Sequence, residues 1–213
     1  MLENLLNEAA INAAKLDKTA ISNEDIDKAY YTIIAGSEKK DRSSIKERER
    51  QITAYHEGGH ALAIKLLSPE NSVAKITIIP STKGAGGFCL NVPQDKMYYT
   101  KTELENQAVA LLAGRAAEEL VFGKENITTG ASNDIERANA IIKDYVTKYG
   151  MSDEIGMSNA DGDKAEKECQ NIMKKLYGKA LDILDQNKAA LKKIAQALLE
   201  KETLSEEQLD ALL

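Results

Sequence analysis

Residues 54–61 read Ala54-Tyr-His-Glu-Gly-Gly-His-Ala61, and the chain's only two histidines, His56 and His60, stand four positions apart within them. Four residues of an α-helix turn through about 400°, so the two imidazoles lie on one face. Two imidazoles at this spacing can bind one metal ion, and zinc is the usual metal for such a pair. Glu57 follows His56 directly, where its carboxylate can serve as the general base toward a water on the metal. The motif H-E-x-x-H therefore predicts a zinc site on a helix.

A purely structural role is the alternative for the same residues, because an isolated histidine is more often packed than metal-bound. The glycines argue against it. Gly58 and Gly59 each cost a helix about 1 kcal/mol relative to alanine. A helix that accepts both between two histidines is expected to approach a substrate or another helix closely. The metal site is the interpretation that accounts for the whole motif.

Composition limits the class of protein. The chain has 213 residues, of which 43% are hydrophobic and 29% charged, and its formal net charge is -6. These values are typical of a globular protein of one or two small domains, and they give no indication of a nucleic-acid partner. Cys89 and Cys169 fit no ligand spacing, which indicates a reducing compartment. No signal peptide or membrane-length apolar run is present, so we expect this chain to be soluble, whatever its parent protein is.

The hydrophobic periodicity predicts a mainly α-helical fold with a small β-sheet or hairpin. Helices are expected at 2–16, 22–36, 45–67, 100–123, 132–150, 163–186 and 188–201, with a last short helix capped by Ser205. Ser22 and Ser132 are expected as N-caps, and Thr100 with Glu103 makes a capping box for the helix that Gly123 closes. Residues 1–40 form a helical hairpin that begins without a cap, as if cut from a larger protein. A polar, charged stretch follows Gly36 and is typical of a linker, which places a domain boundary near residue 40.

The segment from Val73 to Pro80 is the clearest strand, and residues 88–92 follow as a second strand after a glycine-rich turn. In a zinc protease, a substrate can add as an extra strand to an open edge near the metal, held by backbone hydrogen bonds. On that interpretation the substrate-binding residues are Ile76, Thr77, Ile78 and Ile79. An ordinary hairpin with no substrate role is the alternative.

The third metal ligand is not decided by spacing. A catalytic zinc ion takes three protein ligands and one water, and the chain has no third histidine. Glu118 or Glu119 could serve from the helix expected at 100–123, and Asp134 could serve from the next helix. Asp134 also has a structural interpretation, because a carboxylate in the first turn of a helix is favoured by the helix dipole.

Several segments resemble the FtsH family of membrane-anchored, ATP-dependent zinc metalloproteases. Residues 54–62 resemble the zinc helix of that family, and residues 2–10 resemble the helical lid of its AAA+ ATPase domain. Further family segments are matched, in the same order, by residues 75–80, 113–120 and 128–138. Because several long motifs occur in the correct order, the resemblance is specific and covers most of the chain.

The resemblance implies a function and a set of site residues. His56, His60 and Asp134 would bind one Zn²⁺ per chain, with Glu57 as the general base of an endopeptidase. Residues 1–40 would be the C-terminal part of the AAA+ lid and residues 41–213 the zinc metalloprotease domain. The parent protein would be a homohexamer that degrades unfolded or unwanted polypeptides. It would sit in the bacterial plasma membrane, or an organelle equivalent, with this domain on the cytoplasmic side. ATP and Mg²⁺ would bind only in an ATPase part that is absent here.

Two departures from the family pattern leave a second function open. The family usually has alanine or serine where this chain has Gly58, and its polar stretch after the position of Gly156 is usually longer. With the ATPase also absent, the chain could be a zinc-stabilised, non-catalytic oligomerisation module, that is, a pseudoprotease. The intact Glu57 argues against that alternative.

Overall fold

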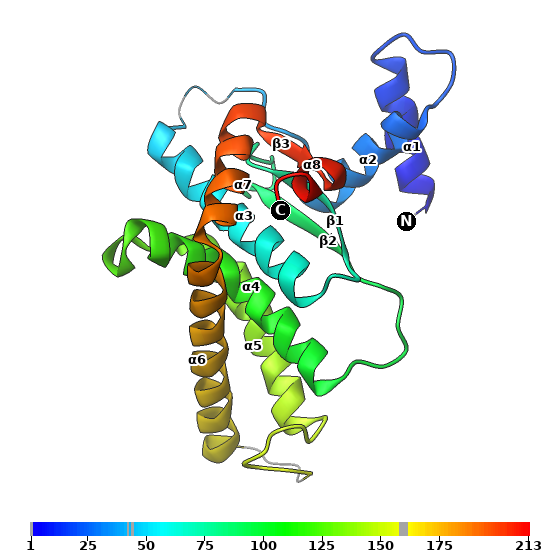
Figure 1. Ribbon diagram of the computed structural model, residues 1–213. Helices are drawn as coiled ribbons and strands as arrows, with labels where there is room; N and C mark the ends of the chain where they lie inside the picture. Colours follow the sequence, from blue (N-terminus) through cyan, green and yellow to red (C-terminus); the bar gives the residue numbers. More distant parts are fainter. Residues whose placement is uncertain (1, 42, 44, 158–161) are drawn as a thin grey trace. The chain divides into compact units, whose positions relative to one another are not determined.

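The computed structural model of the chain describes residues 2–41, 43, 45–157 and 162–213, and it confirms a mainly α-helical fold with a small sheet (Figure 1). The helices are α1 (Leu2–Ala14), α2 (Asn23–Ala35), α3 (Glu47–Leu67), α4 (Lys101–Phe122), α5 (Ser132–Thr147), α6 (Gly162–Gln186), α7 (Lys188–Lys201) and α8 (Glu206–Asp210). The strands are β1 (Ser72–Thr77), β2 (Phe88–Val92) and β3 (Thr203–Ser205), and two 3₁₀ turns are η1 (Lys124–Asn126) and η2 (Thr129–Ala131). None of the helices among the described residues is long and apolar enough to span a bilayer.

The chain divides into two compact units. The first consists of Met1–Ile45 and Ile79–Phe88, and the second of Lys46–Ile78 and Cys89–Leu213. In the first unit α1 packs against α2. Ser22 caps α2, as the sequence predicted, and it does so in a reciprocal capping box with Asp25. The inclusion of Ile79–Phe88 in this unit was not predicted. The assignment of residues 1–40 to an ATPase lid stays a prediction.

In the second unit α4 packs against α3, α5 and α6, and Figure 1 shows α4, α5 and α6 side by side. Small residues make the contact between α3 and α4 close. A Cβ atom on Gly59 would lie 2.6 Å from the carbonyl oxygen of Ala113 and 2.8 Å from the Cβ of Ala117. The close helix approach expected from the two glycines of the motif is therefore present at Gly59.

The three strands form one sheet in the order β2-β1-β3. β3 runs antiparallel to β1, with Ile76 opposite Leu204, and the N–H of Ile78 donates to the carbonyl of Glu202 at 2.9 Å. Because β1 is the middle strand, the open edge expected at Ile76, Thr77 and Ile78 is not there, and that expectation was wrong. β3 could not be predicted, since three residues are too few for a recognisable alternation of apolar and polar side chains. Ile79, the fourth predicted contact, belongs to the first unit.

The start of α5 also differs from the prediction. Ser132 was expected to cap this helix but is its first residue, and Ala131 holds the cap position without a side-chain hydrogen bond. The side-chain cap lies instead on the preceding element η2. The side chain of Thr128 accepts a hydrogen bond from the N–H of Gly130 and caps η2, which leads into α5. The shortened polar stretch predicted after Gly156 includes residues 158–161, which lie outside the described residues.

Candidate metal centre

The two histidines of the motif lie on α3 and are both buried, with exposed fractions of 7% for His56 and 8% for His60. Their ring centroids are 4.8 Å apart. The turn of the helix over four residues brings both rings to the face that packs against α4. The spacing of the motif thus produces the shared face that it predicted.

Each ring is oriented by a hydrogen bond at Nδ1. The Nδ1 of His56 lies 2.6 Å from Oε1 of Glu118, and the Nδ1 of His60 lies 2.8 Å from the carbonyl oxygen of Ala110. Both acceptors belong to α4. With Nδ1 as the donor in each ring, Nε2 is the nitrogen that remains for a metal, which is the usual arrangement around metal-binding histidines.

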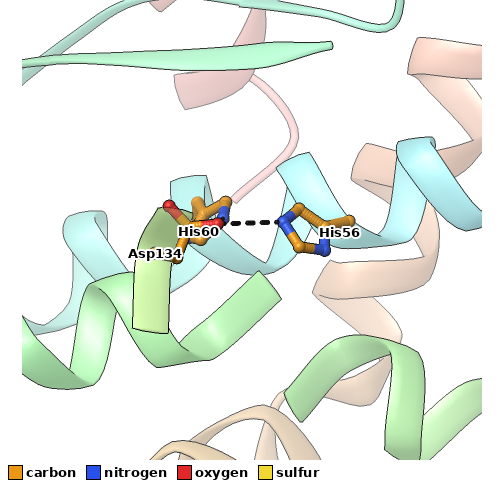
Figure 2. A group of neighbouring side chains, drawn as sticks. All are labelled: His56, His60 and Asp134. Carbon is orange, nitrogen blue, oxygen red and sulfur yellow. Dashed lines mark hydrogen bonds and ion pairs between the residues drawn. The ribbon is translucent and has the colours of Figure 1, made fainter. Parts of the chain in front are cut away.

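Asp134 reaches the same point from α5, as Figure 2 shows. Its Oδ2 lies 3.4 Å from Nε2 of His56 and 3.5 Å from Nε2 of His60, and the ligand atoms of the three residues all lie within 4.8 Å of one another. Two ligand atoms on one tetrahedral zinc ion are separated by about 3.4 Å, given zinc–ligand distances of about 2.0–2.1 Å. The two separations between Oδ2 of Asp134 and the histidine nitrogens match that value.

A glycine on α4 lies against the two Nε2 atoms. A Cβ atom on Gly114 would lie 2.5 Å from Nε2 of His60 and 2.6 Å from Nε2 of His56, so a methyl group there would crowd both ligand nitrogens. Gly114 lies four residues after Ala110 and four before Glu118, so the three residues share one face of α4. On that face the Ala110 carbonyl and the Glu118 carboxylate accept hydrogen bonds from the histidines, and Gly114 between them has no side chain. Two imidazoles and one carboxylate are typical ligands of a zinc ion, and no side chain of Gly114 crowds them.

The electrostatic environment favours a cation. Burial opposes charge on Asp134, but hydrogen bonds to the two histidines hold the pKa of its carboxyl well below the usual range. Burial likewise favours a neutral His56, but hydrogen bonds to Asp134 and Glu118 raise its pKa to about 10. Three carboxyl groups, including that of Glu57, surround two imidazoles, and a bound divalent ion would balance that excess of negative charge.

Glu57 is buried, with an exposed fraction of 8%. Burial raises the pKa of its carboxyl, and the neighbouring histidines partly offset that effect. A carboxylate with a raised pKa beside a metal site is suited to accept and return a proton.

Neither of the alternative carboxylates faces the Nε2 atoms. Glu118 uses one oxygen for Nδ1 of His56 and accepts from the backbone N–H of Thr128 with the other, at 2.7 Å. Glu119 accepts a hydrogen bond from the hydroxyl of Tyr177 at 2.6 Å. The structure thus brings Asp134 to the histidines, although its assignment as a metal ligand stays a prediction.

Sequence reasoning missed several parts of the site. The carbonyl of Ala110 could not be identified, because a backbone acceptor has no side-chain signal, whereas Gly114 had one as a glycine within a strongly helical segment. Cys89 was also missed. Burial raises the pKa of its thiol well above the usual value, and the charges of Glu57 and Asp134 raise it further. The charges of Glu57 and Asp134 therefore act on Cys89, which lies on β2.

Comparison with known proteins agrees with this geometry. The model of peptidase family M41 matches residues 43–167 and 157–212. A protein named ATP-dependent zinc metalloprotease FtsH from Lachnoclostridium phytofermentans is 52% identical over 219 aligned residues, which cover 100% of this chain and 38% of that relative. FtsH 1 of Alkaliphilus metalliredigens is 48% identical, covering 99% of this chain and 37% of the relative. FtsH of Bacillus subtilis is 40% identical, and the alignment covers 100% of this chain and 36% of that relative. The chain therefore spans less than two-fifths of the length of these relatives.

Proposed function

Because the chain belongs to peptidase family M41, we propose that it is the zinc-dependent endopeptidase domain of a longer, ATP-dependent protease. The resemblance inferred from the sequence segments is confirmed by the family match and by relatives that cover the whole chain. The names of those relatives include zinc and ATP dependence, and this proposal extends both to the protein from which the chain comes.

The observation that carries the proposal is the convergence of His56, His60 and Asp134. Oδ2 of Asp134 lies 3.4–3.5 Å from both Nε2 atoms, which suits ligands of one zinc ion, while both Nδ1 atoms are hydrogen-bonded to α4. Three protein ligands leave one position for water or substrate, which is the pattern of a catalytic rather than a structural zinc site.

A bound zinc ion would supply Lewis acidity, lowering the pKa of a water and polarising the carbonyl of the scissile peptide. Glu57 would accept the proton of that water and pass it to the leaving amine. Its buried position and raised pKa support this role, since the carboxyl must hold a proton for part of the cycle. Glu118 and the carbonyl of Ala110 would keep the two histidines in the binding tautomer.

Unfolded polypeptide segments are the proposed substrates, and β2 is the proposed docking strand. β2 is an edge strand of the sheet among the described residues, and the charges of Glu57 and Asp134 raise the pKa of its Cys89. An extended substrate would pair with its backbone, which selects for extended conformation more than for side-chain identity. The proposed substrate-binding residues are therefore 89–92 on β2, in place of residues 76–79.

For the whole protein we propose a homohexamer anchored in a membrane, with an ATPase part that uses ATP and Mg²⁺ to deliver substrates. Residues 1–40 would be the end of the ATPase lid, and residues 41–213 the protease domain. These statements rest on the family and on the relatives, of whose length the chain covers less than two-fifths.

Hydrolysis of unfolded casein, measured beside zinc content, tests the proposal. We expect chelator-sensitive cleavage by the purified chain with about one zinc per chain. The variant Glu57→Gln should retain zinc and lose cleavage, because it removes the base and leaves the ligands. Loss of zinc from Glu57→Gln would instead make Glu57 a ligand. Stoichiometric zinc without any cleavage by the unaltered chain would favour the non-catalytic module.

A further inference from the structure

Thr128, in the connection between α4 and α5, is hydrogen-bonded to α4 through both of its backbone polar groups. Its backbone N–H donates to Oε2 of Glu118 at 2.7 Å, and its carbonyl accepts from Nη2 of Arg115 at 2.9 Å. Arg115 and Glu118 are three residues apart on α4 and therefore share one face of the helix. The backbone N–H and carbonyl of Thr128 are thus each hydrogen-bonded to a charged side chain. Such hydrogen bonds are stronger than those between neutral groups.

This attachment lies on the path to the third ligand. Thr128 caps η2, which continues directly into α5, and Asp134 is in the first turn of α5. Ala131, between them, is fully buried. The 3₁₀ turn η2 and the first turn of α5 join Thr128 to Asp134, so a displacement at Thr128 would be passed to the carboxylate.

Glu118 connects the same attachment to the first histidine. One of its oxygens accepts from Thr128 and the other lies against Nδ1 of His56. Within the described part of the chain, Arg115 forms no such hydrogen bond to a histidine, and its hydrogen bond goes to the carbonyl of Thr128. Glu118 can therefore act through His56, whereas Arg115 can act on the metal site through Thr128 and Asp134.

We propose that Arg115 is a positioning residue for the metal site, holding Thr128 so that the carboxylate of Asp134 meets the two Nε2 atoms. The inference rests on the proposed zinc site. The guanidinium fork of Arg115 reaches the backbone carbonyl of Thr128, which a shorter side chain would miss.

The test is a double-mutant cycle on zinc affinity, measured at fixed pH by competition with a chromophoric chelator. Arg115→Gln should weaken zinc binding about 10- to 100-fold, the usual effect of losing a residue that orients a ligand. In the background of Asp134→Asn the same substitution should change zinc affinity by less than about 3-fold, because the residue through which it acts is already gone. An unchanged effect in that background would overturn the proposal.

A matched arginine and a second substitution control for structure. Arg48 is exposed and bonds the side chain of Asn126 in the same connection, at 3.2 Å, so Arg48→Gln should leave zinc affinity unaltered. Arg115→Met keeps the aliphatic stem and its packing while removing the donors, and it should weaken zinc binding as Arg115→Gln does. Circular dichroism of the metal-free variants reports folding. If both Arg115 variants are unfolded without metal, the residue is structural and the proposal fails.

Zinc binding by the unaltered chain distinguishes an error in the proposed function from an error in the role of Arg115. If the unaltered chain does not bind zinc, the proposed function is wrong. If the unaltered chain binds zinc and Arg115→Gln binds it equally well, only the positioning role is wrong.

Discussion

At the scale of single residues, Gly114 gives the most direct test of the metal position. Gly114→Ala would place a methyl group 2.5–2.6 Å from both Nε2 atoms, so we expect zinc affinity to fall by about 10-fold or more. Gly178→Ala on α6 is the matched control, because a Cβ there meets no atom within 4 Å. Zinc titration of both variants checks the prediction, and a folded Gly114→Ala variant with unaltered affinity would contradict it.

The identity of the third ligand is a second question at this scale. Asp134→Asn keeps the size of the side chain but removes its charge, and we expect zinc affinity to fall more than about 100-fold, beyond the range for orienting residues. Glu119→Gln is the comparison, since Glu119 bonds Tyr177 and not the histidines. Elemental analysis after dialysis distinguishes the two. Zinc retained by Asp134→Asn and lost by Glu119→Gln would reverse the assignment.

The site residues differ in how far the sequence could reveal them. His56, Glu57 and His60 are set by one helical period, so their spacing alone predicted a shared face. Asp134 meets them across 78 positions of chain, and only tertiary packing brings it there. Its residue type was ambiguous too, because an aspartate in the first turn of a helix also serves the helix dipole. The family resemblance, not the spacing, singled it out.

At the scale of elements, the two glycines of α3 should respond differently to substitution. Gly59→Ala would bring a Cβ within 2.6 Å of a backbone oxygen on α4, and we expect a loss of about 1–3 kcal/mol in the free energy of unfolding. Gly58→Ala meets only side chains, the nearest being Ile194 Cγ2 at 3.3 Å. The gain in helix propensity is about 1 kcal/mol, so that variant should be as stable as the parent or slightly more stable. Urea unfolding of the two variants measures the difference, and equal losses would show that α7 is packed as tightly here as α4.

The cap of α2 predicts a pH dependence. Hydrogen bonds from Lys18 and Ser22 lower the pKa of Asp25 to about 2, whereas the unfolded value is about 3.9. The stabilisation from this carboxylate is therefore complete above about pH 4 and is lost as the pH falls toward 2. Asp25→Asn should lower the thermal unfolding midpoint of the first unit at pH 7. In this variant the midpoint should also fall less between pH 4 and pH 2 than it does in the parent. Asp27→Asn, on the exposed side of α2, is the control, and an identical acid profile for both variants would contradict the prediction.

Elements with a strong local signal were predictable, and those fixed by pairing were not. The capping box of Thr100 with Glu103 begins α4, and Gly123 follows its end, as the sequence indicated. β3 is three residues long and exists because Leu204 is buried opposite Ile76. Nothing in its own residues distinguishes it from a loop, so the position of β1 in the middle of the sheet could be learned only from the structure.

At the scale of the whole molecule, the metal site joins elements that the backbone alone does not connect. His56 and His60 belong to α3 and Asp134 to α5, while α4 lies against both helices and supplies the orienting acceptors. The site therefore depends on the assembled second unit, and a ligand that binds only the assembled form stabilises it. The first unit contributes no residue to the group that could hold the ion among the described residues.

Removal of zinc should consequently destabilise the second unit and leave the first unaffected. At free zinc about 100 times the dissociation constant, binding contributes about 2.7 kcal/mol, which corresponds to roughly 5–10 °C in the midpoint for a chain of this length. Thermal unfolding followed by circular dichroism, with and without a chelator, measures the shift. The variant Asp134→Asn provides the control, because a chain that no longer holds zinc has none to lose and its midpoint should not respond to chelator. A chelator effect of equal size in that variant would mean that the stabilising ion binds elsewhere, since only a site that includes Asp134 makes the response depend on this carboxylate.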